Sequence, residues 1–318
     1  MRNIRPKSLD EFIGQEKVVE SLKIAILSSK SRNDHLDHIL FYGPPGLGKT
    51  TLAHIIANEL KVSIKFVTGP SIEKVGDIAG ILINLSPKDI LFIDEIHRLA
   101  KPIEEVLYSA MEDFKLPVVA GSKKSAHTIT INLQPFTLIG ATTRFGLISP
   151  PLRDRFGMIF HLELYTPSEL KQIIVKDAEM LGIKIDEDAA LEIGKRARGT
   201  PRIAIQLLKR VRDYCNVNGA EPITKEEALD AFKNLNIDEF GLNDIDRKYI
   251  STLMKNFHGG PAGIEAISSA MGEDKGTVEE IIEPYLIKIN FIIRTPKGRI
   301  VTPIAKEYLG IKDDDVLF

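Results

Sequence analysis

The sequence predicts an α/β domain with a parallel sheet, followed by a helical section and a C-terminal winged-helix section. Three observations lead to this prediction. Short apolar runs alternate with helical periodicity over residues 1–165, helix-start signals dominate residues 166–238, and helices followed by two strand-like runs make up residues 239–318. Continuous apolar runs between helices are typical of a parallel sheet covered on both faces.

Five short apolar runs are the expected strands of the sheet. They are rich in Ile, Leu and Phe, and they lie at 39–42, 64–67, 90–93, 136–139 and 158–162. β-Branched and aromatic residues pack well on a pleated surface, and the stretches between the runs show helical spacing.

The middle section carries the start signals of three helices. Thr166 is followed by Pro167 and Glu169, which combines an N-cap, a proline at the first helical position and a capping box. Thr200 directly precedes a proline, and Thr224 precedes a glutamate three residues later. Each is a helix N-terminus by the same logic.

The last section has the pattern of three helices and a β-hairpin. It begins with four apolar residues spaced four apart, Ile245, Tyr249, Leu253 and Phe257. Helices are expected near 263–271 and 274–287, and strand-like runs at 291–293 and 300–301 flank a turn at 295–298. This order fits a winged helix.

Composition excludes some classes of protein. The chain has 318 residues and a formal net charge of −2, so it has no uniformly basic coat for nucleic acid, although a local basic patch is possible. Its apolar stretches fall short of the ~18 residues that a membrane helix needs, and no membrane association is expected. The single cysteine, Cys215, cannot form an internal disulfide and is expected to be a small packed residue. Without an apolar signal segment, a cytoplasmic location is expected.

The strongest motif, GPPGLGKT, begins at Gly43 and matches the phosphate-binding pattern G-x-x-x-x-G-K-[ST] in full. Gly43, Gly46 and Gly48 let backbone N–H groups close around phosphates at a helix N-terminus. Lys49 would reach the β- and γ-phosphates of a nucleotide, and the Thr50 hydroxyl would ligate Mg²⁺. A ligand-free glycine-rich turn is the alternative, which the preceding strand and following helix disfavour.

Two acidic residues follow the third apolar run. Asp94 and Glu95 end this run, and carboxylates there are costly unless they meet a cation. Asp94 fits a partner of Mg²⁺, and Glu95 fits the base that orients water. Surface acids are the alternative, but beside a phosphate loop the pair makes ATP hydrolysis the leading hypothesis. For His97 and Arg98 we expect surface roles.

Later residues could supply charge to a phosphate. Thr143 follows the fourth run and could orient water, or it could be an ordinary β-branched strand residue. Arg153 and Arg155 could stabilise phosphoryl charge, sometimes from a neighbouring subunit, or could pair with Asp154 at the surface. Arg202 lies in the first turn of a helix, where the dipole disfavours a cation, so we expect it to contact an anion such as the γ-phosphate.

The order of these features resembles the AAA+ ATPases, and several motifs resemble the RuvB family of Holliday-junction branch-migration motors. The motifs that carry the resemblance lie at 4–7, 12–15, 43–51, 92–99, 110–114, 140–144, 152–157 and 283–287. The resemblance runs over essentially the whole chain. It implies an AAA+ P-loop ATPase domain, a small helical lid domain and a winged-helix DNA-binding domain, with ATP and Mg²⁺ as cofactors.

The resemblance also implies roles for individual residues. Contacts to phosphates and Mg²⁺ fall on Lys49, Thr50 and Thr51. Thr143 and Arg202 match the two sensor residues, and Arg155 matches an arginine finger that reaches a neighbour's ATP. Three residues match family positions near the nucleotide: Ile4, Arg5 and Tyr165. Three more match a stretch at its rim: Glu112, Asp113 and Phe114. Contacts to DNA fall on Arg294 and Arg299.

For partners, the resemblance implies a homohexamer around double-stranded DNA at a Holliday junction, working with RuvA and with the nuclease RuvC. A β-hairpin at about 117–133 would dock on RuvA. Its turn, GSKKSAH at 121–127, departs from the usual family pattern of a Gly-Pro pair followed by an arginine.

The charge pattern of the last section favours phosphate contacts from the hairpin. Residues 239–318 contain 10 basic and 13 acidic side chains, yet residues 288–306 contain five cations and no acid. The third helix carries Glu279, Glu280 and Glu283, which suits it poorly to a major groove. The hairpin would contact the DNA backbone with little sequence preference. A solvated turn is the alternative.

Two other functions use similar parts. A DNA-binding ATP switch of the initiator or clamp-loader type would turn over slowly, but residues 152–155 read LRDR where clamp loaders typically have Ser-Arg-Cys. A protein-remodelling AAA+ ATPase without a DNA role is disfavoured by the basic hairpin.

Overall fold

A computed structural model describes residues 5–120 and 127–310. The chain divides into two compact units. The first comprises Met1–Ile183 and Gly199–Gln206, and the second comprises Lys184–Arg198 and Leu207–Phe318. Within the described ranges, none of the helices has the length and apolarity needed to cross a membrane.

The first unit is built on a five-stranded parallel sheet, as predicted. The strands pair in the order β2-β3-β6-β1-β7. Their bounds are β1 Ile39–Tyr42, β2 Ile64–Thr68, β3 Ile90–Asp94, β6 Thr137–Thr142 and β7 Met158–His161. The three central strands, β3, β6 and β1, are almost completely buried, which explains their continuous apolar sequences.

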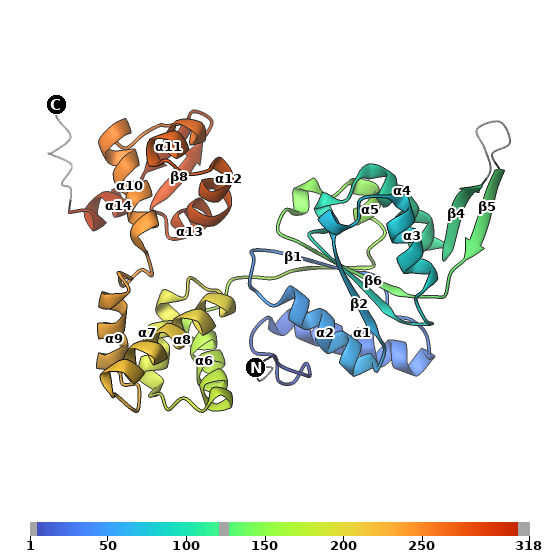
Figure 1. The fold of residues 1–318 in the computed structure, drawn as a ribbon, viewed down its shortest axis with the longest axis horizontal. Helices are drawn as coiled ribbons and strands as arrows, with labels where there is room; N and C mark the ends of the chain where they lie inside the picture. Colours follow the sequence, from blue (N-terminus) through green and yellow to red (C-terminus); the bar gives the residue numbers. More distant parts are fainter. Residues whose placement is uncertain (1–4, 121–126, 311–318) are drawn as a thin grey trace. The chain divides into compact units, whose positions relative to one another are not determined.

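Helices cover both faces of this sheet (Figure 1). On one side lie α1 Glu16–Arg32 and α2 Lys49–Leu60, and on the other lie α3 Val75–Ile83, α4 Lys101–Glu112 and the short α5 Pro150–Arg153. Apolar side chains of α3 and α4 pack with the sheet in one buried cluster that includes Leu40, Leu91 and Leu138. The helix α6 Pro167–Leu181 follows the sheet and begins with the predicted capping box at Thr166.

A buried histidine fixes the strand that leads into the phosphate loop. His38 Nδ1 accepts a hydrogen bond from the Leu138 amide at 2.8 Å, and its Nε2 lies 3.1 Å from the Met111 carbonyl oxygen. Burial lowers the pKa of His38 to about 4, so the ring is neutral near pH 7. The neutral ring can donate from Nε2 and accept at Nδ1, which ties β1 to β6 and α4.

A β-hairpin extends from the first unit. Strands β4 Lys115–Ala120 and β5 His127–Asn132 pair antiparallel, and the hairpin projects away from the sheet (Figure 1). These bounds agree with the predicted hairpin at 117–133. Residues 121–126 of its divergent turn lie outside the described ranges.

The second unit contains the remaining helices and the winged helix. The helices that precede the winged helix are α7 Glu187–Arg196 and α9 Lys225–Asn234, together with the part of α8 Pro201–Asn218 from residue 207 onward. Cys215 is buried in this part of α8, as expected.

The winged helix follows with α10 Asp244–Phe257, α11 Ile264–Met271 and the two-stranded wing, β8 Ile292–Thr295 and β9 Gly298–Val301. A final helix, α14 Pro303–Tyr308, was not predicted.

The predicted third helix of the winged section is present, but its geometry changes along its length. It runs without a break through α12 Lys275–Thr277, a π-helical segment Val278–Ile282 and α13 Glu283–Lys288, which agrees with the prediction near 274–287. Pro284 has no backbone N–H, so an α-helix could not continue through it with all its hydrogen bonds. The segment of π geometry ends at Ile282, two residues before this proline.

Candidate nucleotide site

A pocket of about 510 Å³ opens at the carboxyl edge of the sheet. Asp94 ends β3, and the phosphate loop and Thr143 directly follow β1 and β6. Ligands commonly bind at this edge of an open parallel sheet. Eleven of the predicted site residues line the pocket: Arg5, Gly46, Gly48, Lys49, Thr50, Thr51, Asp94, Glu95, Thr143, Tyr165 and Arg202.

The phosphate loop needs glycine at two close approaches. Gly43 has φ 139°, and a Cβ there would lie 2.4 Å from the Leu162 carbonyl oxygen. Gly46 has φ 81°, and its Cβ would meet Thr200 at 2.7 Å and Arg202 at 3.0 Å. Glycine alone fits both the backbone conformation and the space. The loop therefore packs directly against the start of α8, which carries Arg202.

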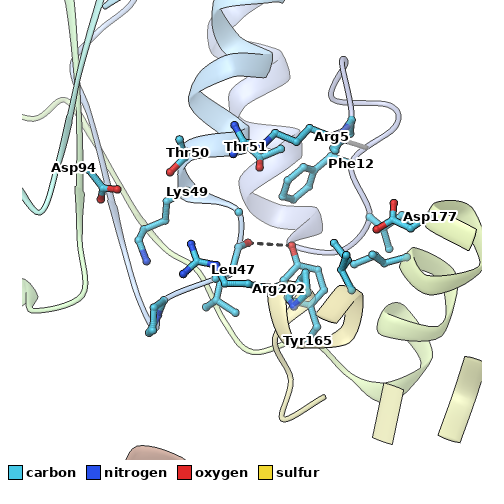
Figure 2. Close-up of a pocket in the computed structure, with 18 of the residues that line it drawn as sticks. Arg5, Phe12, Leu47, Lys49, Thr50, Thr51, Asp94, Tyr165, Asp177 and Arg202 are labelled. Carbon is cyan, nitrogen blue, oxygen red and sulfur yellow. Dashed lines mark hydrogen bonds between the residues drawn. The ribbon is translucent and has the colours of Figure 1, made fainter. Parts of the chain in front are cut away.

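Lys49 points back along its own loop (Figure 2). Its Nζ donates hydrogen bonds of 2.8 Å to the carbonyl oxygens of Gly43 and Pro44. Burial lowers the pKa of Lys49 to about 8, while nearby Asp94 raises it and Arg202 lowers it. Near pH 7 Lys49 is still mostly charged, but burial disfavours that charge, and an anion placed beside it would stabilise it.

ATP binding is therefore expected to weaken as the pH rises above about 8. Phosphates would raise the pKa of Lys49, so the bound state holds more protons than the free state above pH 8, and affinity falls with increasing pH. Calorimetric titrations at pH 7 and 9, in buffers of different ionisation enthalpy, would measure proton uptake at pH 9 and almost none at pH 7. Equal proton uptake at both values would contradict the assignment.

The acidic pair lies in the same pocket with distinct partners. The Asp94 carboxylate accepts the Glu95 amide at 3.0 Å, and the Glu95 carboxylate pairs with Arg98 at 3.2 Å. Glu95 has φ 50°, a left-handed conformation that is uncommon outside glycine and is often found at functional sites. Arg98 was expected to have only a surface role, but it also forms an ion pair with the candidate base Glu95.

Tyr165 and the N-terminal segment form another wall of the pocket. The Tyr165 hydroxyl donates to the Leu47 carbonyl oxygen at 3.3 Å, as the dashed line in Figure 2 shows. Phe12 and Asp177 also line the pocket but were not predicted as site residues. Phe12 belongs to the 12–15 motif, which was a usable signal, whereas nothing in the local sequence around Asp177 indicates a site.

Six residues predicted for the nucleotide site are not among the described residues that line the pocket. Gly43 contributes its carbonyl oxygen to Lys49, and Ile4 lies outside the described residues. The other four are Glu112, Asp113, Phe114 and Arg155, and none of them lines this pocket. Arg155 pairs with Glu112 at 3.0 Å rather than with Asp154.

The two wing arginines share one buried carboxylate. Glu283 is fully buried and accepts the Tyr249 hydroxyl at 2.9 Å. Arg294 approaches Glu283 Oε2 at 2.6 Å, and Arg299 approaches Oε1 at 2.8 Å. The Arg294 side chain is 43% exposed and that of Arg299 only 15%. Glu283 therefore does not present its charge to solvent, so it does not add to the acidic surface expected of the third helix.

Three family models of known proteins match nearly all of the described chain. Residues 4–162 match the family model "Holliday junction DNA helicase RuvB P-loop domain", residues 165–238 match "RuvB AAA lid domain", and residues 239–310 match "RuvB C-terminal winged helix domain".

Curated relatives and solved structures give the same result. The chain is 55% identical over 315 residues to the Holliday junction branch migration complex subunit RuvB of Fusobacterium nucleatum, covering 99% of this chain and 94% of the relative. It is 55% identical over 310 residues to the subunit of the same name from Kosmotoga olearia, covering 98% and 91%. The solved Thermotoga maritima RuvB Holliday junction branch migration motor is 50% identical, with a TM-score of 0.88 over 97% of this chain and 99% of that chain.

Proposed function

Because this chain belongs to the RuvB family, we propose that it is an ATP-hydrolysing motor subunit that drives branch migration of Holliday junctions. The observation that carries the proposal is one pocket that gathers the phosphate loop, the Asp94–Glu95 pair, Thr143 and Arg202. A winged helix in the same chain supplies a module for DNA. The initiator or clamp-loader alternative is disfavoured, because all three matching family models describe RuvB.

The residues around the pocket fit ATP with Mg²⁺. The Thr50 hydroxyl and the Asp94 carboxylate line the same cavity, and Mg²⁺ is commonly held by one or two protein oxygens together with substrate phosphates. When bound, the ion would neutralise phosphate charge. Lys49 and Arg202 would hold the phosphates, and the Glu95 carboxylate and Thr143 hydroxyl would orient the attacking water.

We propose that a second subunit completes this site, as it would in a ring. Arg155 does not line its own pocket, which agrees with an arginine finger supplied to a neighbour. A homohexamer around duplex DNA, with RuvA docked on the hairpin β4–β5 and RuvC as a further partner, is the assembly we propose. The cytoplasmic location and the division at 165/166 and 238/239 stay predictions.

A short segment could pass the state of ATP to the winged helix. Arg202 lines the pocket, and four residues earlier Arg198 pairs with Asp246, which is 1% exposed on α10. Arg198 also donates to the Gly241 carbonyl oxygen at 2.9 Å and lies over the Tyr285 ring. We propose that movement of Arg202 on hydrolysis is passed along the chain to Arg198 and thus to α10.

A migration assay tests the proposal. With a four-way junction, RuvA and ATP, this chain should produce the two duplex products, and omission of RuvA or ATP should abolish them. Lys49→Ala should bind no ATP and give no products. Rapid ATP hydrolysis that DNA stimulates, but that never moves a junction, would contradict the motor function.

The wing should contribute a phosphate contact through Arg294. Arg294→Gln removes the more exposed cation but leaves Arg299 to neutralise Glu283. We expect weaker binding to every duplex sequence, with the slope of log affinity against log salt reduced by about 0.9 for each subunit in contact. Fluorescence anisotropy at several salt concentrations measures this slope. Lys255→Gln, an equal charge change on α10, is the control, and a slope unchanged by Arg294→Gln would contradict the contact.

A further inference from the structure

The guanidinium of Arg155 is held on its own subunit by three neighbours. Its Nη1 donates to the Pro151 carbonyl oxygen at 2.7 Å, and its Nη2 donates to Glu112 Oε2 at 3.0 Å. The ring of Tyr108 lies under the guanidinium, 4.5 Å from its central carbon. The Arg155 side chain is only 21% exposed, although it is expected to act on a ligand outside its own subunit.

The hydroxyl group of Tyr108 is held by two further side chains. Its hydroxyl donates to Glu104 Oε2 at 3.0 Å and lies 3.1 Å from the Ser149 hydroxyl, which donates to the same carboxylate at 2.6 Å. Glu104 is buried, and Ser149 caps α5 by accepting the Leu152 amide. These bonds join α4 to α5 beneath the arginine, so the Tyr108 ring is a rigid support.

The ion pair between Arg155 and Glu112 is better suited to orientation than to stability. The Glu112 side chain is 57% exposed, and exposed ion pairs contribute little to folding. The pair does, however, choose one rotamer for a long and flexible side chain. Its two described hydrogen bonds leave the second hydrogen on each terminal nitrogen for an anionic oxygen.

We propose that Tyr108 and Glu112 are positioning residues for the Arg155 finger, holding its guanidinium in the orientation in which it meets the neighbouring subunit's ATP. The inference rests on the proposed function, in which Arg155 acts between subunits. It also gives Glu112 a specific role: the carboxylate acts through Arg155, and the nucleotide need not touch it.

Loss of either support should lower kcat and leave KM unchanged. The ATP pocket of each subunit does not include Tyr108 or Glu112, so binding of ATP is untouched. A misplacement of about 1 Å can cost up to about 10²-fold in rate, and we expect about a tenfold loss of kcat for Glu112→Ala and for Tyr108→Leu. Tyr108→Phe retains the ring and should recover most of the rate.

Mixed rings on DNA decide whether the effect acts between subunits. A donor subunit, Lys49→Ala, keeps the finger but cannot bind ATP, and an acceptor subunit, Arg155→Ala, binds ATP but lacks the finger. In the mixture, ATP can be hydrolysed only where it is bound by an acceptor subunit and reached by Arg155 of a neighbouring donor subunit. Glu112→Ala or Tyr108→Leu should lower kcat about tenfold when placed in the donor, and should have no effect in the acceptor, which also shows that the altered subunit folds.

Each outcome is distinguishable. Glu105→Ala in the donor, an equal loss of charge on the exposed face of α4, should change nothing. Equal losses in donor and acceptor, a raised KM, or unchanged kcat would overturn the positioning role. If donor and acceptor without further substitutions fail to hydrolyse ATP together, Arg155 does not act between subunits, and that part of the proposed function fails with the inference.

Discussion

Replacing Arg155 with alanine is expected to lower ATP turnover by about 10³-fold or more while ATP binding persists, since arginine fingers are worth about 10³–10⁵ in kcat. The physical reason is that Arg155 lies outside its own subunit's pocket, so the substitution removes charge stabilisation in the transition state but no contact to bound ATP in that subunit. Phosphate release under steady-state conditions, together with equilibrium binding of a fluorescent ATP analogue, measures the two quantities separately.

The neighbouring Arg153 provides the matched control for this prediction. The central carbon of its guanidinium lies 5.1 Å from the centre of the Phe145 ring, and Arg153 takes no part in the Arg155–Glu112 ion pair. Arg153→Ala should therefore retain most of the ATPase activity. A loss of ATP affinity in Arg155→Ala as large as the loss of turnover would mean that the residue acts within its own subunit.

Replacing Glu95 with glutamine is the second large effect. We expect ATP to bind but to be hydrolysed about 10²–10⁴-fold more slowly, because the amide cannot take up a proton from the attacking water. Glu95 lines the pocket beside Asp94, and its carboxylate is half exposed. Rapid-quench measurement of a single turnover distinguishes slow chemistry from slow release of product.

Two variants sharpen the interpretation of Glu95. Glu20→Gln, an equal change of charge on α1, should hydrolyse ATP normally. Arg98→Ala removes the ion pair that holds the Glu95 carboxylate, and we expect a smaller loss than for Glu95→Gln because the base itself remains. Normal single-turnover chemistry in Glu95→Gln would exclude Glu95 as the base.

The phosphate loop and its surroundings could be predicted because their chemistry depends on residues close together in sequence. Gly43, Gly46 and Lys49 lie within seven positions of one another, and the loop conformation follows from that spacing. The strands were equally predictable, because burial on both faces demands continuous apolar runs. The helix predicted near 274–287 is also present, but the π-helical segment that precedes Pro284 is a local change that helical periodicity does not reveal.

Pairs formed by residues distant in sequence could not be predicted. Arg155 has an acid directly before it, yet its carboxylate partner is Glu112, 43 positions earlier. Asp177 reaches the pocket from α6 with no local motif to mark it. In each case the choice of partner follows from which helices pack together, and that is decided by the whole unit.

The basic stretch at 288–306 shows most clearly what the sequence determines and what the tertiary structure determines. The sequence alone determined the fold class, the nucleotide site and a local excess of cations on the wing. Only the tertiary structure brought the buried Glu283 between Arg294 and Arg299, and so decided that one of these cations is largely buried and the other is partly free. A carboxylate removed from water must be neutralised where it lies, and sequence charge counts contain no information about which cation does so.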